Sequence, residues 1–350
     1  MSRPRTDERP GPAEAAASGP LRISVAHPAE LGPEELSRWR AMQRASLPLA
    51  SPFLSPDFTL AVSRVRPGAR VAVLEAGGTI VGFLPYERRR FAIGRPIGAG
   101  VCDRQGVIHV PGLRWDPEAL VRSCGLAGLE FDHLLADQAP FRPYHAGTAP
   151  TYIMDLGAGY DAYLRERLRA SRRSLKAMFV KRRKLESQVG EISFDLHAPQ
   201  HDVLEALMRW KSGQYRRTGW PDRFAERWVV RLVEDLFETS AAECSGTLSV
   251  LRAGGRVVAS HFGLRSQSVL CCWFPTYDVR FAGYSPGLLL HLEMARAAAE
   301  LGVQHLDLGK GEERYKETLR TWELPLAECS VERPSVRALE IGRASCRERV

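Results

Sequence analysis

The chain has 350 residues, of which 44% are hydrophobic, and its formal net charge is +8. This length predicts two domains of ordinary size, and this apolar content is enough to build packed cores. No apolar run reaches the roughly 18–20 residues of a membrane-spanning helix, and the seven cysteines show neither metal-ligand nor disulfide spacing. The composition therefore argues against a membrane-spanning or disulfide-stapled protein, and it predicts a cytoplasmic protein without a metal site.

The charge is carried mainly by arginine, which outnumbers lysine 43 to 6. A GC-rich gene favours arginine codons, so the overall basicity is weak evidence for nucleic-acid binding. The lysines all fall in the second half of the chain, which indicates that this half handles an anionic ligand: Lys176, Lys181, Lys184, Lys211, Lys310 and Lys316.

Both ends of the chain differ in composition from the rest. Residues 1–20 are charged and rich in Pro, Gly and Ala, which predicts a disordered leader. Residues 340–350 read like a translated sequencing adapter, which predicts a non-native tail.

Taken in chain order, the first half begins with a strand at 21–26 and a helix at 33–46. Residues 71–81 then pair two apolar runs across a Gly-Gly dipeptide, a pattern typical of a β-hairpin whose turn needs positive φ. A predicted helix at 116–126 and a predicted strand at 129–134 follow.

The second half repeats this order. Residues 248–258 (LSVLRAGGRVV) match residues 71–81 (VAVLEAGGTIV), with Val250 standing 177 positions after Val73 (250 − 73). A helix at 286–301 and a strand at 303–308 follow. Two copies of one α/β module are therefore predicted, each a mixed twisted sheet flanked by helices, over residues 21–156 and 157–335.

Between the two hairpins lies a long basic helix, predicted from about Tyr160 to Gln188. Residues 165–184 carry ten basic side chains and one acid, Glu166. One interpretation is a solvated amphipathic helix, and the other is a docking face for an anionic substrate or a membrane surface. Sequence-specific nucleic-acid binding is less favoured, because the basic residues lack interleaved stacking aromatics. A strand at 191–198 and helices at 200–217 and 222–239 follow.

The segment that most strongly indicates a binding or catalytic site consists of a predicted strand at 268–278, a loop, and the predicted helix that begins at 286. Ser285 is placed to cap this helix, Pro286 suits its first position, and Gly287 permits close backbone approach. Such a loop can cradle a phosphate. Arg280, Gly283 and Ser285 approximate the pyrophosphate loop of acyltransferases, R/Q-x-x-G-x-G/A, although any capped helix after a loop would look similar.

A second cluster follows the next strand, in DLGKGEERYKETLRTW (307–322). Open α/β sheets bind ligands at strand ends, where this stretch places many charged residues. The alternative is an exposed helix start with ordinary i,i+4 pairs, such as Glu312 with Lys316.

These two segments together resemble the CelD-like acetyltransferases, a GNAT-related family associated with bacterial cellulose and exopolysaccharide production. The matching motifs are Tyr277-Asp278, Ser285-Pro286-Gly287, and Asp307-x-Gly309-x-Gly311-x-x-x-Tyr315-Lys316. The resemblance spans about 160–325 and includes the basic helix. This family is also similar to the Fem-type aminoacyl transferases, which carry two fused GNAT modules.

The resemblance implies transfer of an acyl group from acyl-CoA to an amine or hydroxyl, with a sugar or polysaccharide precursor as a candidate acceptor, and with no metal. It places catalysis on a base and an acid, with Asp307 preferred as base before Glu312 and His261, and Tyr315 as acid. His261 also reads as a core histidine. The remaining candidates would hold the donor (Arg280, Gly283, Ser285, Gly287, Lys310, Lys316) or the acceptor (Trp210, Tyr215, Arg217, Tyr277, Asp278). Pro286 departs from the usual loop because it removes one backbone donor.

Two other functions stay open. A Fem-like transferase would use aminoacyl-tRNA as the donor, and the basic helix at 165–184 would bind the RNA. An accessory protein of exopolysaccharide synthesis would have lost catalysis. The first module lacks a comparable charged loop, which predicts a degenerate copy that serves as scaffold or binds the acceptor.

Overall fold

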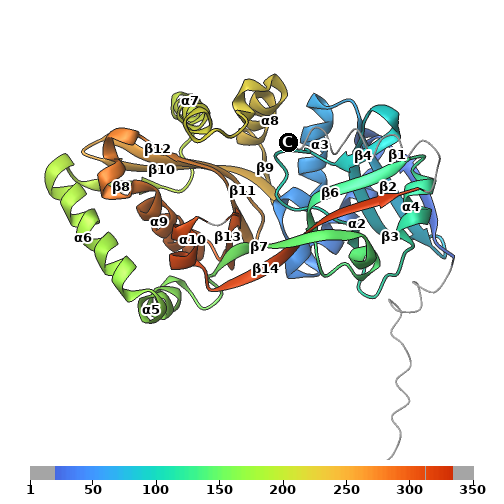
Figure 1. Ribbon diagram of the computed structural model, residues 1–350, viewed down its shortest axis with the longest axis horizontal. Helices are drawn as coiled ribbons and strands as arrows, with labels where there is room; N and C mark the ends of the chain where they lie inside the picture. The colour runs from blue at the N-terminus through green and yellow to red at the C-terminus, as the bar shows by residue number, and fades with distance from the viewer. Residues whose placement is uncertain (1–19, 312, 334–350) are drawn as a thin grey trace, which may run out of the picture.

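The computed structural model describes residues 20–311 and 313–333, and within them the strands form one continuous mixed sheet of 14 strands. Its order is β1-β2-β3-β4-β6-β14-β7-β13-β12-β11-β10-β8, with β5 beside β3 and β9 beside β10. Helices cover the sheet along its length (Figure 1). The predicted α/β class with two mixed, helix-flanked modules is confirmed. The predicted leader, apart from residue 20, and the predicted tail lie outside the described residues.

The first module contains β1 (Arg22–Ala26), α2 (Pro33–Arg44), α3 (Pro56–Val65), β2 (Ala69–Ala76), β3 (Thr79–Arg88), β4 (Ile93–Pro96), β5 (Ile108–His109), α4 (Pro117–Ser123), β6 (Gly128–Leu135) and β7 (His145–Asp155).

The second module contains α5 (Tyr160–Ala170), α6 (Arg172–Val189), β8 (Ile192–Asp195), α7 (His201–Thr218), α8 (Arg227–Phe237), β9 (Ser240–Ala241), β10 (Cys244–Ala253), β11 (Arg256–Arg265), β12 (Val269–Tyr277), α9 (Pro286–Glu300), β13 (His305–Lys310), α10 (Arg314–Leu319) and β14 (Trp322–Glu332).

The repeated hairpins are β2–β3 and β10–β11. Both turns use two glycines in the left-handed region: φ is 56° and 76° at Gly77 and Gly78, and 54° and 75° at Gly254 and Gly255. Each hairpin also shifts register once, after Leu74 and after Leu251, so even this irregularity recurs at the offset of 177 (251 − 74). The prediction of two repeated hairpins is confirmed down to the backbone conformation of the turns.

The two modules share strands across their junction. β7 pairs with β13 of the second module on one side and with β14 on the other, while the distal part of β14 pairs with β6 of the first module. The C-terminal strand therefore completes the sheet of the first module (Figure 1). The division at 156/157 stays a prediction.

The modules also share a hydrophobic core. Phe53, Phe58 and Val101 of the first module are buried together with Phe262 and Trp273 of the second. The ring of Trp273 lies edge-on to Phe53, with centroids 5.4 Å apart. Burial of this much aromatic surface holds the two modules in a fixed relation.

Two helix predictions need correction. The long basic helix is broken at Ser171, whose φ of −130° and ψ of 37° are not helical, so it divides into α5 and α6. The helix predicted over 222–239 begins only at Arg227, because Asp222 caps a short 3-10 turn at 223–225 instead. Among the described residues, no helix combines the length and apolar character needed to cross a membrane.

Candidate active site

The candidate site begins where two parallel strands separate. β12 and β13 pair only from Val269 opposite His305 to Cys271 opposite Asp307, after which β12 continues to Tyr277 paired with β11 alone. This opening leaves the backbone of β12 without a partner strand on that side, where a bound ligand could take the free groups. We call it the strand opening.

One predicted catalytic residue, His261, lies next to the opening but points into the core. The side chain of His261 is fully buried, and its Nε2 accepts the backbone N–H of Trp273 at 3.1 Å, at the position where β12 bulges against β11. Burial holds the pKa of His261 well below its usual value, helped by the nearby His291 and Lys211. The neutral ring therefore fixes the β12 bulge, as expected of a core histidine.

The loop from β12 to α9 presents an open helix N-terminus. Ser285 occupies the N-cap position, but its φ of 54° is left-handed and its side chain makes no capping bond to the helix. The Ser285 hydroxyl instead accepts a 2.8 Å hydrogen bond from Lys181 Nζ of α6. The predicted capping role of Ser285 is wrong, since the left-handed backbone turns its hydroxyl toward α6.

Other predicted loop residues lie close by. Arg280 is largely exposed and forms a double contact with Asp278, whose Oδ1 also caps the short η7 turn (Val279–Tyr284) by accepting the Arg280 N–H. These hydrogen bonds lower the pKa of Asp278. A Cβ built at Gly283 would meet nothing within 4 Å, and one at Gly287 only Tyr277, at 3.7 Å, so the backbone here is accessible.

Helix α10 supplies Tyr315 and Lys316. The ring of Tyr315 lies 5.2 Å from that of His291, and burial raises the pKa of Tyr315 far above its usual value, so the phenol stays protonated at neutral pH. No hydrogen-bond partner of the Tyr315 hydroxyl occurs among the described residues. Lys316 is buried, and its Nζ donates to the carbonyls of Gly309 (3.2 Å) and Lys310 (2.8 Å).

Asp307, the first candidate for the base, is buried and fully engaged. Its Oδ2 accepts from Arg104 of the first module, and its Oδ1 accepts from the Thr151 hydroxyl and from the Gly309 N–H at 3.0 Å. Asp307 thus ties β13 to β7 and to the first module. Glu312, the second candidate, lies outside the described residues.

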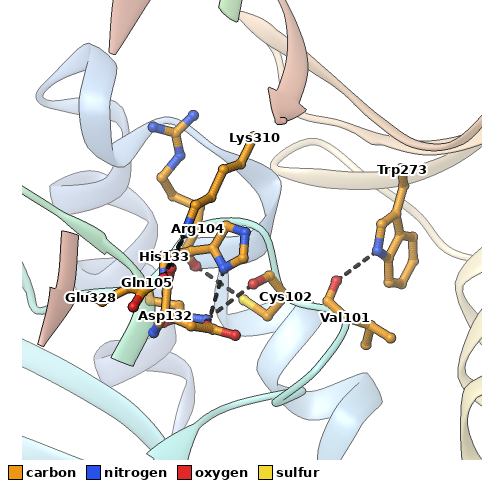
Figure 2. Close-up of polar contacts among 9 residues, drawn as sticks. All are labelled: Val101, Cys102, Arg104, Gln105, Asp132, His133, Trp273, Lys310 and Glu328. Carbon is orange, nitrogen blue, oxygen red and sulfur yellow. Dashed lines mark hydrogen bonds and ion pairs between the residues drawn. The ribbon is translucent and has the colours of Figure 1, made fainter. Parts of the chain in front are cut away.

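Arg104 belongs to a loop of the first module, residues 97–106, that reaches across the junction (Figure 2). Trp273 Nε1 of β12 donates to the Val101 carbonyl at 2.6 Å, and Gln105 Nε2 donates to the Cys102 carbonyl at 3.1 Å. Lys310, predicted to hold the donor, instead lies by β6 and β14, with its Nζ 3.3 Å from both the Asp132 carbonyl and Glu328. We call residues 97–106 the crossing loop.

The crossing loop places Asp103 at the strand opening, and the sequence predictions missed this residue. A Cβ built at Gly309 would lie 3.9 Å from Asp103 Oδ2. Burial raises the pKa of Asp103 to about 6, against the lowering effect of His133 and Lys316. Asp103 has no hydrogen bond or ion pair within the described residues, so its carboxylate remains free to accept a proton.

Lys211 of α7, also missed, faces the same space. It is buried, and its Nζ donates to the Pro275 carbonyl of β12 at 3.0 Å and lies 5.2 Å above the ring of Tyr215. Burial lowers the pKa of Lys211 to about 8, while Glu313 and Asp103 raise it. The only sequence signal for Lys211 was its membership of the small lysine set.

The residues predicted to bind the acceptor do not all lie together. Tyr215 joins Lys211, and burial raises the pKa of its phenol to about 12. Tyr277 is partly exposed beside Gly287, Trp210 is partly buried on α7, and Arg217 is exposed at the end of that helix. In the described part of the chain, no group of three His, Cys, Asp or Glu side chains could hold a metal ion.

Comparisons with known proteins show which family and which folds this chain resembles. Residues 165–317 match the family model described as acetyltransferase (GNAT) domain. A FemX structure is 11% identical with a TM-score of 0.59, covering 90% of this chain and 98% of that one. The C-terminal domain (DUF2156) of a putative lysylphosphatidylglycerol synthetase from Agrobacterium fabrum is 15% identical with a TM-score of 0.51, covering 89% and 96%.

A tandem GNAT protein from the clavulanic acid biosynthesis pathway is 12% identical with a TM-score of 0.50, covering 90% of this chain and all of that one. Comparison of the sequence with curated proteins gives no match. The structural similarities support the fold, and the family model identifies the acetyltransferase domain within it. Residues 165–317 thus match a GNAT acetyltransferase domain, and the fold of the chain is similar to that of a tandem GNAT protein.

Proposed function

We propose that the protein transfers an acyl group from acyl-CoA to an amine or hydroxyl acceptor bound between the two modules. The observation that carries this proposal is the free carboxylate of Asp103, delivered by one module to the strand opening of the other. A partly buried carboxylate with a pKa near 6 is suited to take a proton at neutral pH.

The residues around the loop before α9 fit the diphosphate of acyl-CoA. The N-terminus of a 15-residue helix, an accessible glycine backbone and Lys181 Nζ converge there, and all three favour anions. Arg280 is exposed beside them and can turn from Asp278 toward a ligand. Pro286 removes one donor, and Lys181 offsets that loss with a full positive charge. Bound acyl-CoA would supply an activated thioester to the strand opening.

Two side chains of this chain would handle the protons. The acceptor nitrogen or oxygen forms a bond to the acyl carbon, its proton passes to Asp103, and the carbon–sulfur bond breaks. Tyr315, held protonated by burial, then donates a proton to the departing thiolate. Asp307 as the base stays a prediction, but its oxygens already accept from three donors, which better suits a residue that positions Arg104 and β13.

The acceptor is proposed to be a saccharide or polysaccharide precursor. This proposal rests on the CelD-like motifs Ser285-Pro286-Gly287 and Asp307-x-Gly309, together with the polar groups that face the space between the modules. Lys211, Tyr215 and Glu313 can donate to or accept from sugar hydroxyls there.

The decisive test replaces Asp103 by Asn. Removing a general base should lower kcat/KM for acyl transfer by roughly 10²–10⁴-fold with little change in the KM for acyl-CoA. Asp137→Asn is the matched control, since Asp137 is exposed on the same module and its replacement should leave the rate unchanged. Normal activity in D103N together with inactivity in D307N would return the base to Asp307.

The pH profile checks the same assignment. Asp103 works only when ionised, so kcat/KM should fall as pH drops below about 6, and this limb should vanish from the residual rate of D103N. Because the folded state holds the Asp103 proton more tightly than the unfolded chain, ionised Asp103 destabilises the fold as pH rises through about 6. D103N should therefore raise the melting temperature at pH 8 but not at pH 4.

A second candidate is a Fem-like transferase that takes its acyl group from aminoacyl-tRNA. The likeness to FemX in fold and the exposed arginines of α5 and α6 favour it. Thermal stabilisation of the protein by acyl-CoA would support the CoA donor. No stabilisation, with tRNA binding that weakens steeply between two salt concentrations, would support the tRNA donor; failure of both would leave the accessory role.

A further inference from the structure

A cavity of about 480 Å³ lies where α5, α6 and α10 meet, and its lining includes none of the residues assigned to the proposed acyl-transfer site. Its size falls within the range of small-molecule sites. In Figure 1, α5 and α10 lie together at the lower edge of the second module, where α6 begins. Its polar lining comes from six side chains in particular: Arg167, Ser171, Ser174, Glu317, Thr318 and Arg320.

Arg167 is a buried cation that lacks an anion. Its side chain is 7% exposed, its Nε is buried without a hydrogen-bond partner, and no ion pair to it exists within the described residues. Arg320 on the opposite wall, in contrast, pairs with Glu317 at 2.7 Å and Glu323 at 2.9 Å. A buried guanidinium without a partner costs free energy, so a site that retains one is suited to an external anion.

The N-terminus of α6 opens into the same cavity. The break at Ser171 separates α6 from α5, and the Ser171 side chain makes no capping bond to the 18-residue helix that follows. The first-turn N–H groups and the helix dipole therefore add positive potential next to Arg167. Ser174, in that first turn, and Thr318 of α10 add hydroxyl donors to the lining.

We infer that this cavity binds the phosphate group of a small phosphorylated polyhydroxyl molecule, of the sugar phosphate class. A phosphate offers three acceptor oxygens, which match a guanidinium fork, a helix N-terminus and neighbouring hydroxyls. The cavity exceeds the volume of one phosphate, and the Glu317 carboxylate can accept from ligand hydroxyls. A carboxylate ligand would leave more of these donors unmet.

The test measures binding rather than acyl transfer, so its result is independent of the proposed function. Ribose 5-phosphate, inorganic phosphate and acetate are titrated into the full chain by isothermal calorimetry. Saturable binding of ribose 5-phosphate, weaker binding of phosphate and none of acetate are expected. Arg167→Gln should weaken ribose 5-phosphate binding by about ten- to a hundredfold, since hydrogen bonds between charged groups are lost. Arg165→Gln is the matched control, an exposed arginine on the same helix, and should bind like the wild type.

Thermal melting of Arg167→Met guards against a folding artefact. An apolar side chain in place of the unpaired cation should leave the melting temperature in phosphate-free buffer unchanged or higher. Ribose 5-phosphate should then raise the melting temperature of the wild type but not of R167M. If R165Q and R167Q lost the same affinity for ribose 5-phosphate, the binding would be due to general surface charge and the inference would be wrong. Absence of saturable binding to the wild type would also overturn it.

Discussion

Both modules have a strand–loop–helix unit, but the charged side chain next to the start of the helix is negative in the first module and positive in the second. In the first, the seven-residue α4 begins at Pro117, and the Asp116 carboxylate caps it by accepting the Glu118 N–H at 3.0 Å. In the second, the 15-residue α9 begins at Pro286, has no side-chain cap, and has Lys181 beside its N-terminus. A carboxylate at an N-cap satisfies the donors and repels anions, whereas an uncapped N-terminus with a lysine attracts them.

The loops before these helices differ in the same way. The first module was predicted to lack a charged loop, yet its crossing loop carries Asp103 and Arg104 into the site of the second. The first module thus has a carboxylate at the start of its own helix and contributes charged side chains to the second. Under the proposed function, the two modules together form one site.

The largest expected effect on stability comes from removing the buried ion pair between Arg104 of the first module and Asp307 of the second. Arg104→Met would leave the Asp307 carboxylate buried beside Thr151 without its cation. Loss of one partner of a buried ion pair typically costs about 3–5 kcal/mol. Urea unfolding should show this loss, and the double variant R104M/D307N should recover much of it. An R104M protein as stable as the wild type would show that the crossing loop is held by the shared hydrophobic core alone.

A smaller effect is expected at the anion site of the second module. Lys181→Met should raise the KM for acyl-CoA by about ten- to a hundredfold, because a charged hydrogen-bond donor at the α9 N-terminus is lost. The kcat should change little, since Lys181 makes no hydrogen bond or ion pair with Asp103 or Tyr315 within the described residues. Lys176→Met, an exposed lysine of the same helix, serves as control. Equal effects of the two substitutions would mean that α6 acts through its overall charge.

The sequence predicts best what is encoded locally. The hairpins, the helix starts at Pro33 and Pro286, and the strand at 303–308 follow from residues close in the chain, and all occur in the structure. The repeat was visible because the turn conformation requires the same Gly-Gly pair in both copies.

The candidate site was predicted only in part, because its residues meet through long-range contacts. Asp103 and Gly309 are about 200 residues apart in the chain, and no local pattern around Asp103 marks it as a candidate. Likewise, the left-handed backbone of Ser285 could not be foreseen for a non-glycine residue, so its hydroxyl was assigned to the helix rather than to Lys181.

The smallest and most controlled prediction concerns the repeated turns. A Cβ at Gly78 or Gly255 would meet nothing within 4 Å, so replacement by Ala should cost only the left-handed backbone penalty, about 1–2 kcal/mol in each module. A Cβ at Gly254 would lie 2.2 Å from the Val189 carbonyl oxygen, where α6 ends against the hairpin.

Gly254→Ala should therefore destabilise the protein more than Gly255→Ala, as measured by chemical denaturation of the two variants side by side. The excess reports how tightly the end of α6 is packed on the second hairpin, because the backbone penalty is common to both positions. Equal losses at Gly254 and Gly255 would mean that α6 yields to the added methyl. The position of α6, and with it the contact of Lys181 with Ser285 before α9, would then tolerate small shifts.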